Sequence, residues 1–250
     1  MASHLIGKQA VVVGAGIGGL TAAGALAEYF RQVVVLERDT LLPDAAHRAG
    51  TPQSRHIHGL LAGGQRALGE LFPGFEQDLA DAGALPLRVT LDVRIEMPAY
   101  DPFPQRDLGL VTYSMSRPLI ELVVRRRVEQ NANITLRPRC RVRGLVPSAD
   151  RAAVTEVCFE NADGKNETLP AELVVDASGR GSLTRSLLDA IGKPMPEERP
   201  SSVSISAMPR QSSRSRMTPH PIGKRCGRFP GRRRAGVAHC CCRWRAADGW

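Results

Sequence analysis

Cysteine is scarce through most of the chain. Of the six cysteines, only Cys140 and Cys158 lie before residue 206, and the other four lie between residues 226 and 242. Two widely separated cysteines in a body of this size give no disulfide framework. We therefore expect the protein to reside in a reducing compartment, the cytoplasm.

The sequence also has little that could cross a membrane. One uncharged stretch, residues 10–27, is long enough to span a bilayer. It contains five glycines, which lie between a valine-rich run and an alanine-rich run. A turn between a strand and a helix explains this arrangement better than a membrane span or a secretory signal does. We therefore expect no membrane-spanning segment.

Acidic residues are almost absent from the end of the chain. Residues 206–250 hold 11 Lys+Arg and a single acid, Asp248, whereas residues 1–205 hold 23 Lys+Arg and 24 Asp+Glu. The formal net charge of +9 therefore belongs to the tail, and the body is close to neutral. The arginines of the tail could bind phosphate backbones, but the tail has few aromatic residues among them and no folded support. We expect no nucleic-acid partner.

The sequence also lacks histidines, cysteines and acids at the spacing that metal sites usually have. His56 and His58 lie two residues apart, but no cluster of acids or cysteines nearby completes a site around them. The pair can equally lie in a loop that borders a binding site or in a plain surface loop. Cys240, Cys241 and Cys242 are adjacent, whereas zinc sites usually pair cysteines as C-x-x-C. We expect no metal.

What the sequence does contain begins with a strand–turn–helix–strand unit. Residues 9–13 and 32–37 are valine-rich, apolar runs of the kind that form strands buried on both faces. Residues 20–30 lie between them and carry apolar side chains near helical spacing. Glycines separate the first strand from the helix. The unit predicts an α/β protein with a Rossmann-like, doubly wound domain.

The glycines of the turn have the spacing G-x-G-x-x-G, filled by Gly14, Gly16 and Gly19. The first permits a tight turn, the second lets a pyrophosphate approach the backbone, and the third lets helix and strand pack closely. Glu37 ends the second strand, where a carboxylate can accept hydrogen bonds from the ribose of an adenosine. These features together predict a dinucleotide site. The alternative is a tight turn in another α/β fold.

The rest of the body alternates between further predicted helices and strands. Ser116 is expected to cap a helix whose arginines at 125–127 form its solvated side. The sequence Asn161–Gly164 predicts a hairpin turn between two extended runs. The predicted helices cover residues 61–71, 116–128 and 182–191, and the predicted strands cover residues 84–97, 108–115, 152–160 and 167–175.

Four segments, in chain order, resemble the flavoprotein monooxygenases of the para-hydroxybenzoate hydroxylase type and their geranylgeranyl-reductase-like relatives. They are "VVVGAGIGGLTAAGALAEYFRQVVVLERD" (11–39), "RAGTPQSRHIHGLLAGGQRALGELFPGF" (48–75), "SMSRPLIELVVRRRV" (114–128) and "AELVVDASGRGSLTRSLLDAIGKPMPEE" (171–198). The resemblance spans residues 5–205. It implies FAD on the glycine turn, with a Rossmann-like domain and part of a mixed-sheet substrate domain.

The resemblance also implies roles for particular residues. The ADP half of FAD would be held at the glycine turn and at Glu37, with Arg38 beside it. Arg117 would approach the flavin, and Val142 would lie on the strand near the adenine. Asp176 and Gly179 would lie near FAD and the path of the nicotinamide donor, although Asp176 could simply cap the turn before Ser182. The implied set is Gly14, Gly16, Gly19, Glu37, Arg38, Arg117, Val142, Asp176 and Gly179.

The resemblance implies an FAD-dependent oxidoreductase, in the first place an NAD(P)H-using monooxygenase or hydroxylase of a small organic substrate. A flavin-dependent reductase or dehydrogenase remains an alternative, as does a truncated FAD-binding fragment without catalysis. No side chain in residues 1–205 stands out as a nucleophile or base, so no catalytic residue is predicted. Neither the substrate nor the oligomeric state follows from the sequence.

The resemblance ends near Ser206. Family members usually continue with a second flavin motif and much of the substrate-facing sheet. We therefore expect residues 5–205 to be an incomplete FAD-binding domain and residues 206–250 to be a disordered or frame-shifted tail. A reading-frame change near codon 206 would produce a tail rich in Arg, Pro, Ser and Cys. A natural, disordered basic tail is the rival hypothesis.

Overall fold

A computed structural model of the chain describes residues 5–55, 59–93, 100–179 and 181–195. The basic tail from residue 206 onward lies outside these residues, as do His56 and His58 with their possible metal role. The chain divides into two units, one of residues 1–89 and 108–195 and the other of residues 90–107 and 196–250. In the second unit, Thr90 Oγ1 donates a 2.6 Å hydrogen bond to the carbonyl of Arg106. All the helices and strands below belong to the first unit.

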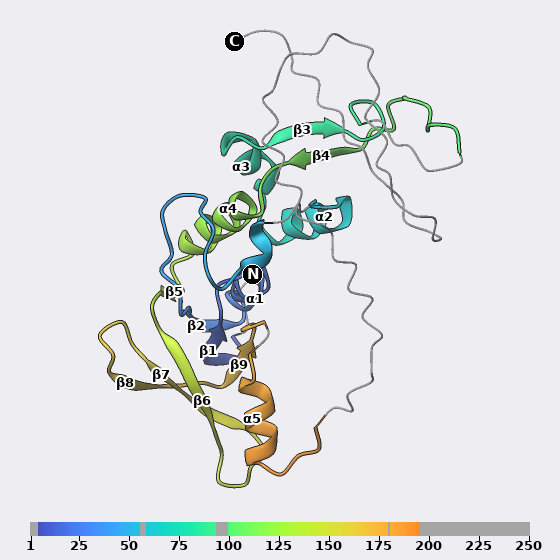
Figure 1. Cartoon of the computed structure of the whole chain (residues 1–250). Coiled ribbons are helices and arrows are strands. Elements are labelled where there is room, and N and C mark those ends of the chain that lie inside the picture. The colour runs from blue at the N-terminus through green and yellow to red at the C-terminus, as the bar shows by residue number, and fades with distance from the viewer. Residues whose placement is uncertain (1–4, 56–58, 94–99, 180, 196–250) are drawn as a thin grey trace. The chain divides into compact units, whose positions relative to one another are not determined.

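A four-stranded parallel sheet lies at the centre of the first unit (Figure 1). Its strands run in the order β5-β2-β1-β9. In this register Val13, the last residue of β1, pairs with Leu36 on one side and with Asp176 on the other. The carboxyl ends of three strands therefore meet around residue 13. The strands are β1 (Gly7–Val13), β2 (Phe30–Leu36), β5 (Ile134–Arg137) and β9 (Leu173–Asp176).

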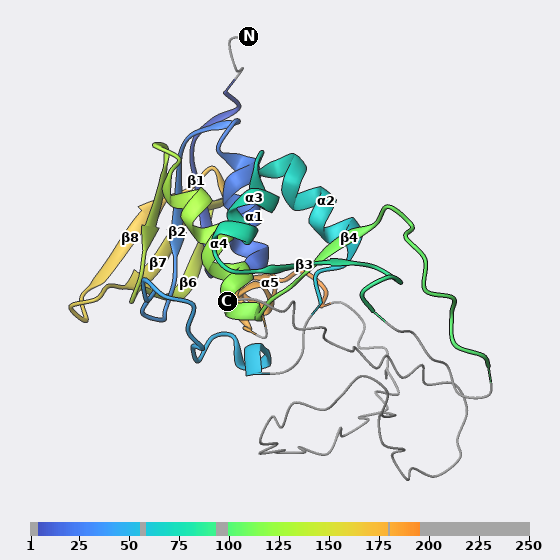
Figure 2. The same cartoon turned by 90° about the horizontal axis from the view of Figure 1, so that it is seen from above.

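Helices cover one face of this sheet (Figure 2). Successive side chains of a strand point to opposite faces, and Val12, Val33 and Val35 point to the helical side, where none is exposed. Their burial against the helices is the main favourable term in the stability of this layer. The helices are α1 (Ile17–Leu26), α2 (Ala62–Leu71), α3 (Phe75–Asp81) and α4 (Arg117–Glu129), and a short 3-10 turn, η1 (Pro52–Arg55), precedes α2.

A second, antiparallel sheet covers the opposite face (Figure 2). It consists of β6 (Arg141–Pro147), β7 (Val154–Glu160) and β8 (Asn166–Pro170). Val157 and Phe159 of β7 pack there against Val11 and Val34 of the parallel sheet. Both faces of the central strands are therefore buried, as their apolar runs predict. A doubly wound sheet carries helices on both faces, whereas here an antiparallel sheet takes the place of the second helical layer.

Several predicted boundaries differ from the observed ones. The predicted helix 20–30 ends at Leu26, because Phe30 is buried as the first residue of β2. Of the predicted strand 84–97, Leu85–Arg88 form β3, which pairs with β4 (Val111–Ser114), and residues 94–97 lie outside the described residues. The hairpin around 161–164 is confirmed as β7 and β8. The run 167–175 is divided between β8 and β9, and α5 (Leu183–Ala190) follows.

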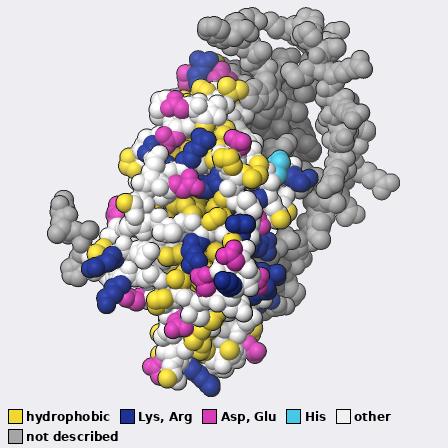
Figure 3. Space-filling view, turned by 90° about the vertical axis from the view of Figure 1, so that its left-hand side faces the viewer, with side chains coloured by type: hydrophobic (Ala, Val, Ile, Leu, Met, Phe, Trp, Pro, Cys, Tyr) yellow, Lys and Arg dark blue, Asp and Glu magenta, His cyan; other side chains and the backbone are white. Residues whose placement is uncertain are grey.

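The arginine run of α4 is not wholly solvated, contrary to the prediction. Arg125 is buried, and its guanidinium donates to the carbonyl of Leu42. Arg127 forms an ion pair with Asp78 of α3. The prediction missed these contacts because both partners come from other segments of the chain. On the face drawn in Figure 3, described side chains of both charge signs lie interspersed, in keeping with a nearly neutral body.

The described residues contain neither a membrane-spanning helix nor a cluster of metal ligands. Within them, no helix combines the length and the apolar character needed to cross a membrane. Nor do three or more His, Cys, Asp or Glu side chains gather there in a way that could hold a metal ion. Cys140 is buried and Cys158 is half-buried, and both are free thiols.

Candidate functional site

The glycine turn follows β1 and is closed by two contacts that only glycine permits. Gly14 has a φ of +99°, in the left-handed region, and a Cβ there would lie 2.7 Å from the carbonyl oxygen of Ala177. A Cβ on Gly19 would lie 1.8 Å from the carbonyl oxygen of Gly14. The turn is therefore packed between α1 on one side and the end of β9 on the other.

Gly16 differs from its two neighbours in the motif because it faces open space. It is the N-cap of α1, has an extended backbone, and a Cβ there would meet nothing within 4 Å. No described side chain caps α1, and no acid lies in its first turn. The amides of this first turn and the positive end of the helix dipole are thus free to receive an anion such as a diphosphate.

Glu37 lies directly after β2 and is only 4% exposed. Its Oε2 accepts a 2.6 Å hydrogen bond from the amide of Ala15, within the glycine turn. Its Oε1 accepts a 2.9 Å bond from the amide of Asp39. An ionised carboxylate has about four acceptor positions, so Glu37 can still accept a hydroxyl. The carboxylate and the turn are therefore one connected unit, which fits the ribose side of a dinucleotide.

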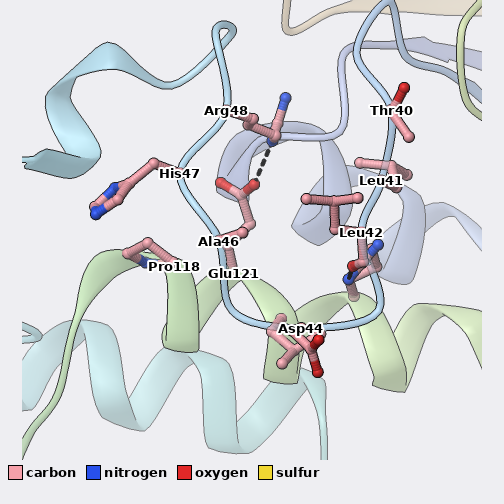
Figure 4. A pocket seen from close by; sticks show the side chains of 11 residues that line it. Thr40, Leu41, Leu42, Asp44, Ala46, His47, Arg48, Pro118 and Glu121 are labelled. Carbon is pink, nitrogen blue, oxygen red and sulfur yellow. Dashed lines mark hydrogen bonds and ion pairs between the residues drawn. The ribbon is translucent and has the colours of Figure 1, made fainter.

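Arg48 joins this unit, although sequence reasoning did not single it out. Its side chain is 11% exposed. The Nη1 atom lies 3.1 Å from Glu37 Oε2 and 3.1 Å from Asp39 Oδ2, and Nη2 donates a 2.8 Å bond to the carbonyl of Ala15. Its Nε donates to Glu121 Oε1 at 2.7 Å, the ion pair drawn in Figure 4. The only sequence signal was its place in the second resembling segment.

The charges around Arg48 outweigh its burial. Burial by itself lowers the pKa of Arg48, but the hydrogen bond and charge of Glu121, the charge of Glu37 and the hydrogen bond to Asp39 raise it above its ordinary value. The guanidinium is thus permanently charged among three carboxylates. A cavity of about 30 Å³ lies beside it, between the loop and α4 (Figure 4). It has room for one or two water molecules and none for a nucleotide.

Arg117 lies at the start of α4, one helical turn before Glu121. Ser116 caps this helix as predicted, since its Oγ accepts from the amide of Leu119 at 3.3 Å, and Pro118 occupies the first turn. The Nε of Arg117 is buried and has no hydrogen-bond partner among the described residues. A buried donor without a partner is costly. An acceptor supplied by a bound cofactor would satisfy it.

Asp176 ends β9, where it caps the next turn. Its Oδ1 accepts from the amide and hydroxyl of Ser178 at 3.1 and 2.5 Å, and its Oδ2 accepts from the amide and hydroxyl of Thr184 at 3.2 and 2.6 Å. Partial burial raises the pKa of Asp176, but these hydrogen bonds outweigh it and hold the pKa below its ordinary value. The local capping role left open by the sequence is thus present. Gly179 follows in a left-handed conformation with a φ of +74°.

Asp176 should make the free energy of unfolding fall as the pH is lowered. Because its pKa is lower in the folded chain, its stabilising effect is present above the unfolded pKa, about 3.9, and is lost as pH falls through the folded value. Between pH 6 and pH 3 the wild type should therefore lose more stability than Asp176→Asn. We expect a difference below about 1 kcal/mol, since the carboxylate is only partly buried and solvent screens its interactions. Urea unfolding at several pH values measures it, and parallel curves would contradict the assignment.

The structure brings five of the predicted site residues together at one edge of the parallel sheet. The three glycines, Glu37 and Asp176 meet at the carboxyl ends of β1, β2 and β9. The side chain of Arg38 is 60% exposed and lies 3.8 Å from Asp39 Oδ1. Val142 is half-buried on β6, where it packs against the core on the face away from α1.

This arrangement of turn, helix and buried acid defines a dinucleotide-binding α/β domain of the Rossmann type. The model of one protein family, described as FAD dependent oxidoreductase, matches residues 9–186. The chain belongs to this family of FAD-dependent oxidoreductases.

Two relatives match over most of this chain. The chain is 34% identical over 223 residues to Protein Rv3254 of Mycobacterium tuberculosis, a match that covers 79% of this chain and 43% of the relative. It is 31% identical over 183 residues to kynurenine 3-monooxygenase of Salinispora tropica, covering 71% and 37% of the two chains. This chain thus spans less than half the length of these relatives.

Solved structures share the fold. One of them is p-nitrophenol 4-monooxygenase PnpA of Pseudomonas putida DLL-E4, with a TM-score of 0.54 and 19% identity. The match covers 73% of this chain and 44% of that structure. At this identity the likeness concerns the fold alone.

Proposed function

We propose that this chain supplies the FAD-binding part of a monooxygenase that takes electrons from NAD(P)H and acts on a small organic molecule. The observation that carries the proposal is the glycine turn, where Gly14 and Gly19 are packed tight while Gly16 stays open before a free helix amino terminus. The monooxygenase part draws support from the likeness to kynurenine 3-monooxygenase. When bound, FAD supplies the redox chemistry, and the protein binds, orients and shields it.

The residues of this site would divide the work between the two ends of the cofactor. The turn and the first amides of α1 would hold the diphosphate, and Glu37 would accept from the ribose. Arg117 would donate its unpaired Nε on the flavin side. Residues 5–205 would form the FAD-binding domain. The proposed set is Gly14, Gly16, Gly19, Glu37, Arg38, Arg117, Val142, Asp176 and Gly179.

Gly16→Val tests the site directly. Its side chain would occupy the open space before α1 without a clash inside the protein, since nothing lies within 4 Å. We expect FAD affinity to fall at least about a hundredfold, or ~2.7 kcal/mol, with the unfolding transition kept. Quenching of flavin fluorescence in a titration measures the affinity. Gly69→Val in α2 is the matched control, because a Cβ there also meets open space but lies in another helix.

Retained stoichiometric FAD in Gly16→Val would refute the site. The reaction class needs a separate experiment, in which FAD-loaded protein is mixed with NADPH or NADH, with and without O₂. Flavin reduction by either donor, followed by O₂-dependent reoxidation, is the expected result. Reduced flavin that is stable in air would favour a reductase or dehydrogenase instead.

A further inference from the structure

Glu121 belongs to none of the predicted site residues, yet it lies at the end of a chain of contacts that leads to the glycine turn. Its side chain is 12% exposed, and its Oε1 accepts from Arg48 Nε at 2.7 Å. The other nitrogens of Arg48 contact Glu37 Oε2 and the carbonyl of Ala15. The amide of Ala15 donates in turn to Glu37 Oε2. Three segments of the chain therefore meet at one guanidinium.

We propose that Glu121 is a positioning residue for the dinucleotide site, acting through Arg48 to hold the Glu37 carboxylate and the backbone at Ala15 in their binding conformation. The inference rests on the proposed function in so far as the dinucleotide is FAD. Glu121 itself need not touch the cofactor.

The geometry of a guanidinium explains why one carboxylate on α4 can act at this distance. Arginine presents five N–H donors in one rigid plane. The Nε–Glu121 bond holds that plane at a third nitrogen, in addition to the contacts of Nη1 with Glu37 and of Nη2 with the carbonyl of Ala15. Without it the plane can rotate about the side-chain axis, and the contacts of Nη1 and Nη2 then loosen together. The Glu37 carboxylate would lose the charge that fixes its rotamer.

The same contact ties the turn to α4, which carries Arg117. Residues four apart on a helix lie on one face, so Arg117 and Glu121 share a face of α4. Each has a buried polar atom for which the described part of the chain offers no hydrogen-bond partner, Arg117 Nε and Glu121 Oε2. The Arg48–Glu121 pair therefore fixes the position of the helix that presents Arg117, relative to the turn that would hold the diphosphate.

Glu121→Gln is the test, because it keeps the shape of the side chain and removes its charge. In the unliganded full chain, hydrogen exchange at the Ala15 amide should become about tenfold faster, since the partner of that amide is less firmly held. The dissociation constant for FAD should rise about tenfold, the effect expected of one charge-assisted hydrogen bond. Glu129→Gln is the matched control, on the same helix but 47% exposed and remote from Arg48.

A double-mutant cycle separates positioning from a general loss of stability. If Glu121 acts only through Arg48, Glu121→Gln should weaken FAD binding in the wild type but have no further effect in an Arg48→Met background. A purely structural Glu121 would instead lower the melting temperature without a selective change at the Ala15 amide. That result would overturn the proposal.

Two other outcomes are decisive. Equal exchange and equal affinity in Glu121→Gln and Glu129→Gln would overturn the proposal, as would tighter FAD binding in Glu121→Gln, which would mean that its charge merely repels the diphosphate. A wild-type chain that binds no FAD would refute the proposed function alone. The exchange rate at Ala15 would then still decide whether Glu121 holds the turn.

Discussion

Gly19→Ala should unfold or severely destabilise the chain. The added methyl would lie 1.8 Å from the carbonyl oxygen of Gly14 and 3.4 Å from the side chain of Ala177. Neither the backbone of the turn nor the end of β9 can move aside without breaking the register of the parallel sheet. Overpacking costs up to about 3 kcal/mol, and we expect a loss of at least that size here. Urea unfolding of the full chain measures it.

Gly18→Ala is the control for this prediction. Gly18 is the preceding residue in the same helix, but a Cβ there meets nothing within 4 Å. Alanine is favoured over glycine in a helix by about 0.5–1 kcal/mol, so this variant should be slightly more stable than the wild type. Opposite signs at adjacent positions would show that the clash, and not the amino-acid change itself, is responsible. Two variants of equal stability would mean that the turn is looser than described.

Arg48→Met should be the second large effect. It removes the cation that lies among three carboxylates whose side chains are 5% (Glu37), 13% (Asp39) and 12% (Glu121) exposed. Removing one partner of a buried ion pair typically costs about 3–5 kcal/mol, because the remaining charge keeps its desolvation penalty. Methionine keeps the volume of the aliphatic part, so a cavity contributes little. Chemical unfolding at neutral pH measures the loss.

Arg38→Met provides the comparison. Arg38 is also an arginine close to Asp39, at 3.8 Å, but its side chain is 60% exposed. Exposed ion pairs contribute about 0–1 kcal/mol, so this variant should unfold almost as the wild type does. A similar loss in both variants would indicate that net charge, and not the buried contacts of Arg48, sets the stability.

The parts of the fold that depend on residues close together in the sequence were predictable from the sequence. The strand before Gly14, the strand before Glu37 and the cap at Ser116 follow from local patterns, and the structure contains all three. Glu37 could be identified because only one helix and one strand follow the glycine turn, so that the residue which ends this strand is found by counting along the sequence. The hairpin between β7 and β8 followed from its turn residues in the same way.

The contacts that complete the site depend on the tertiary fold and had no local signal. Arg48 and Glu121 are 73 residues apart, and no periodicity relates a loop residue to a position on a distant helix. Arg125 was expected in solvent because arginine usually is, yet the loop at Leu42 offers it a buried carbonyl. The early end of α1 has the same cause, since burial of Phe30 in the sheet outweighs its place in the helical pattern.

The pairing of β1 with β9 has a consequence for the order in which the chain folds during synthesis. Val13 pairs with Asp176, and the carbonyl of Ala177 closes the space beside Gly14. The glycine turn leaves the ribosome early, but the wall against which it packs is made more than 160 residues later. Non-local strand pairing is slow, because the loop must close before its contacts form. We therefore expect β1, β2 and α1 to form a provisional unit on the nascent chain. The turn would become competent for a ligand only when β9 is added, so a chaperone or a cofactor could act at that late step.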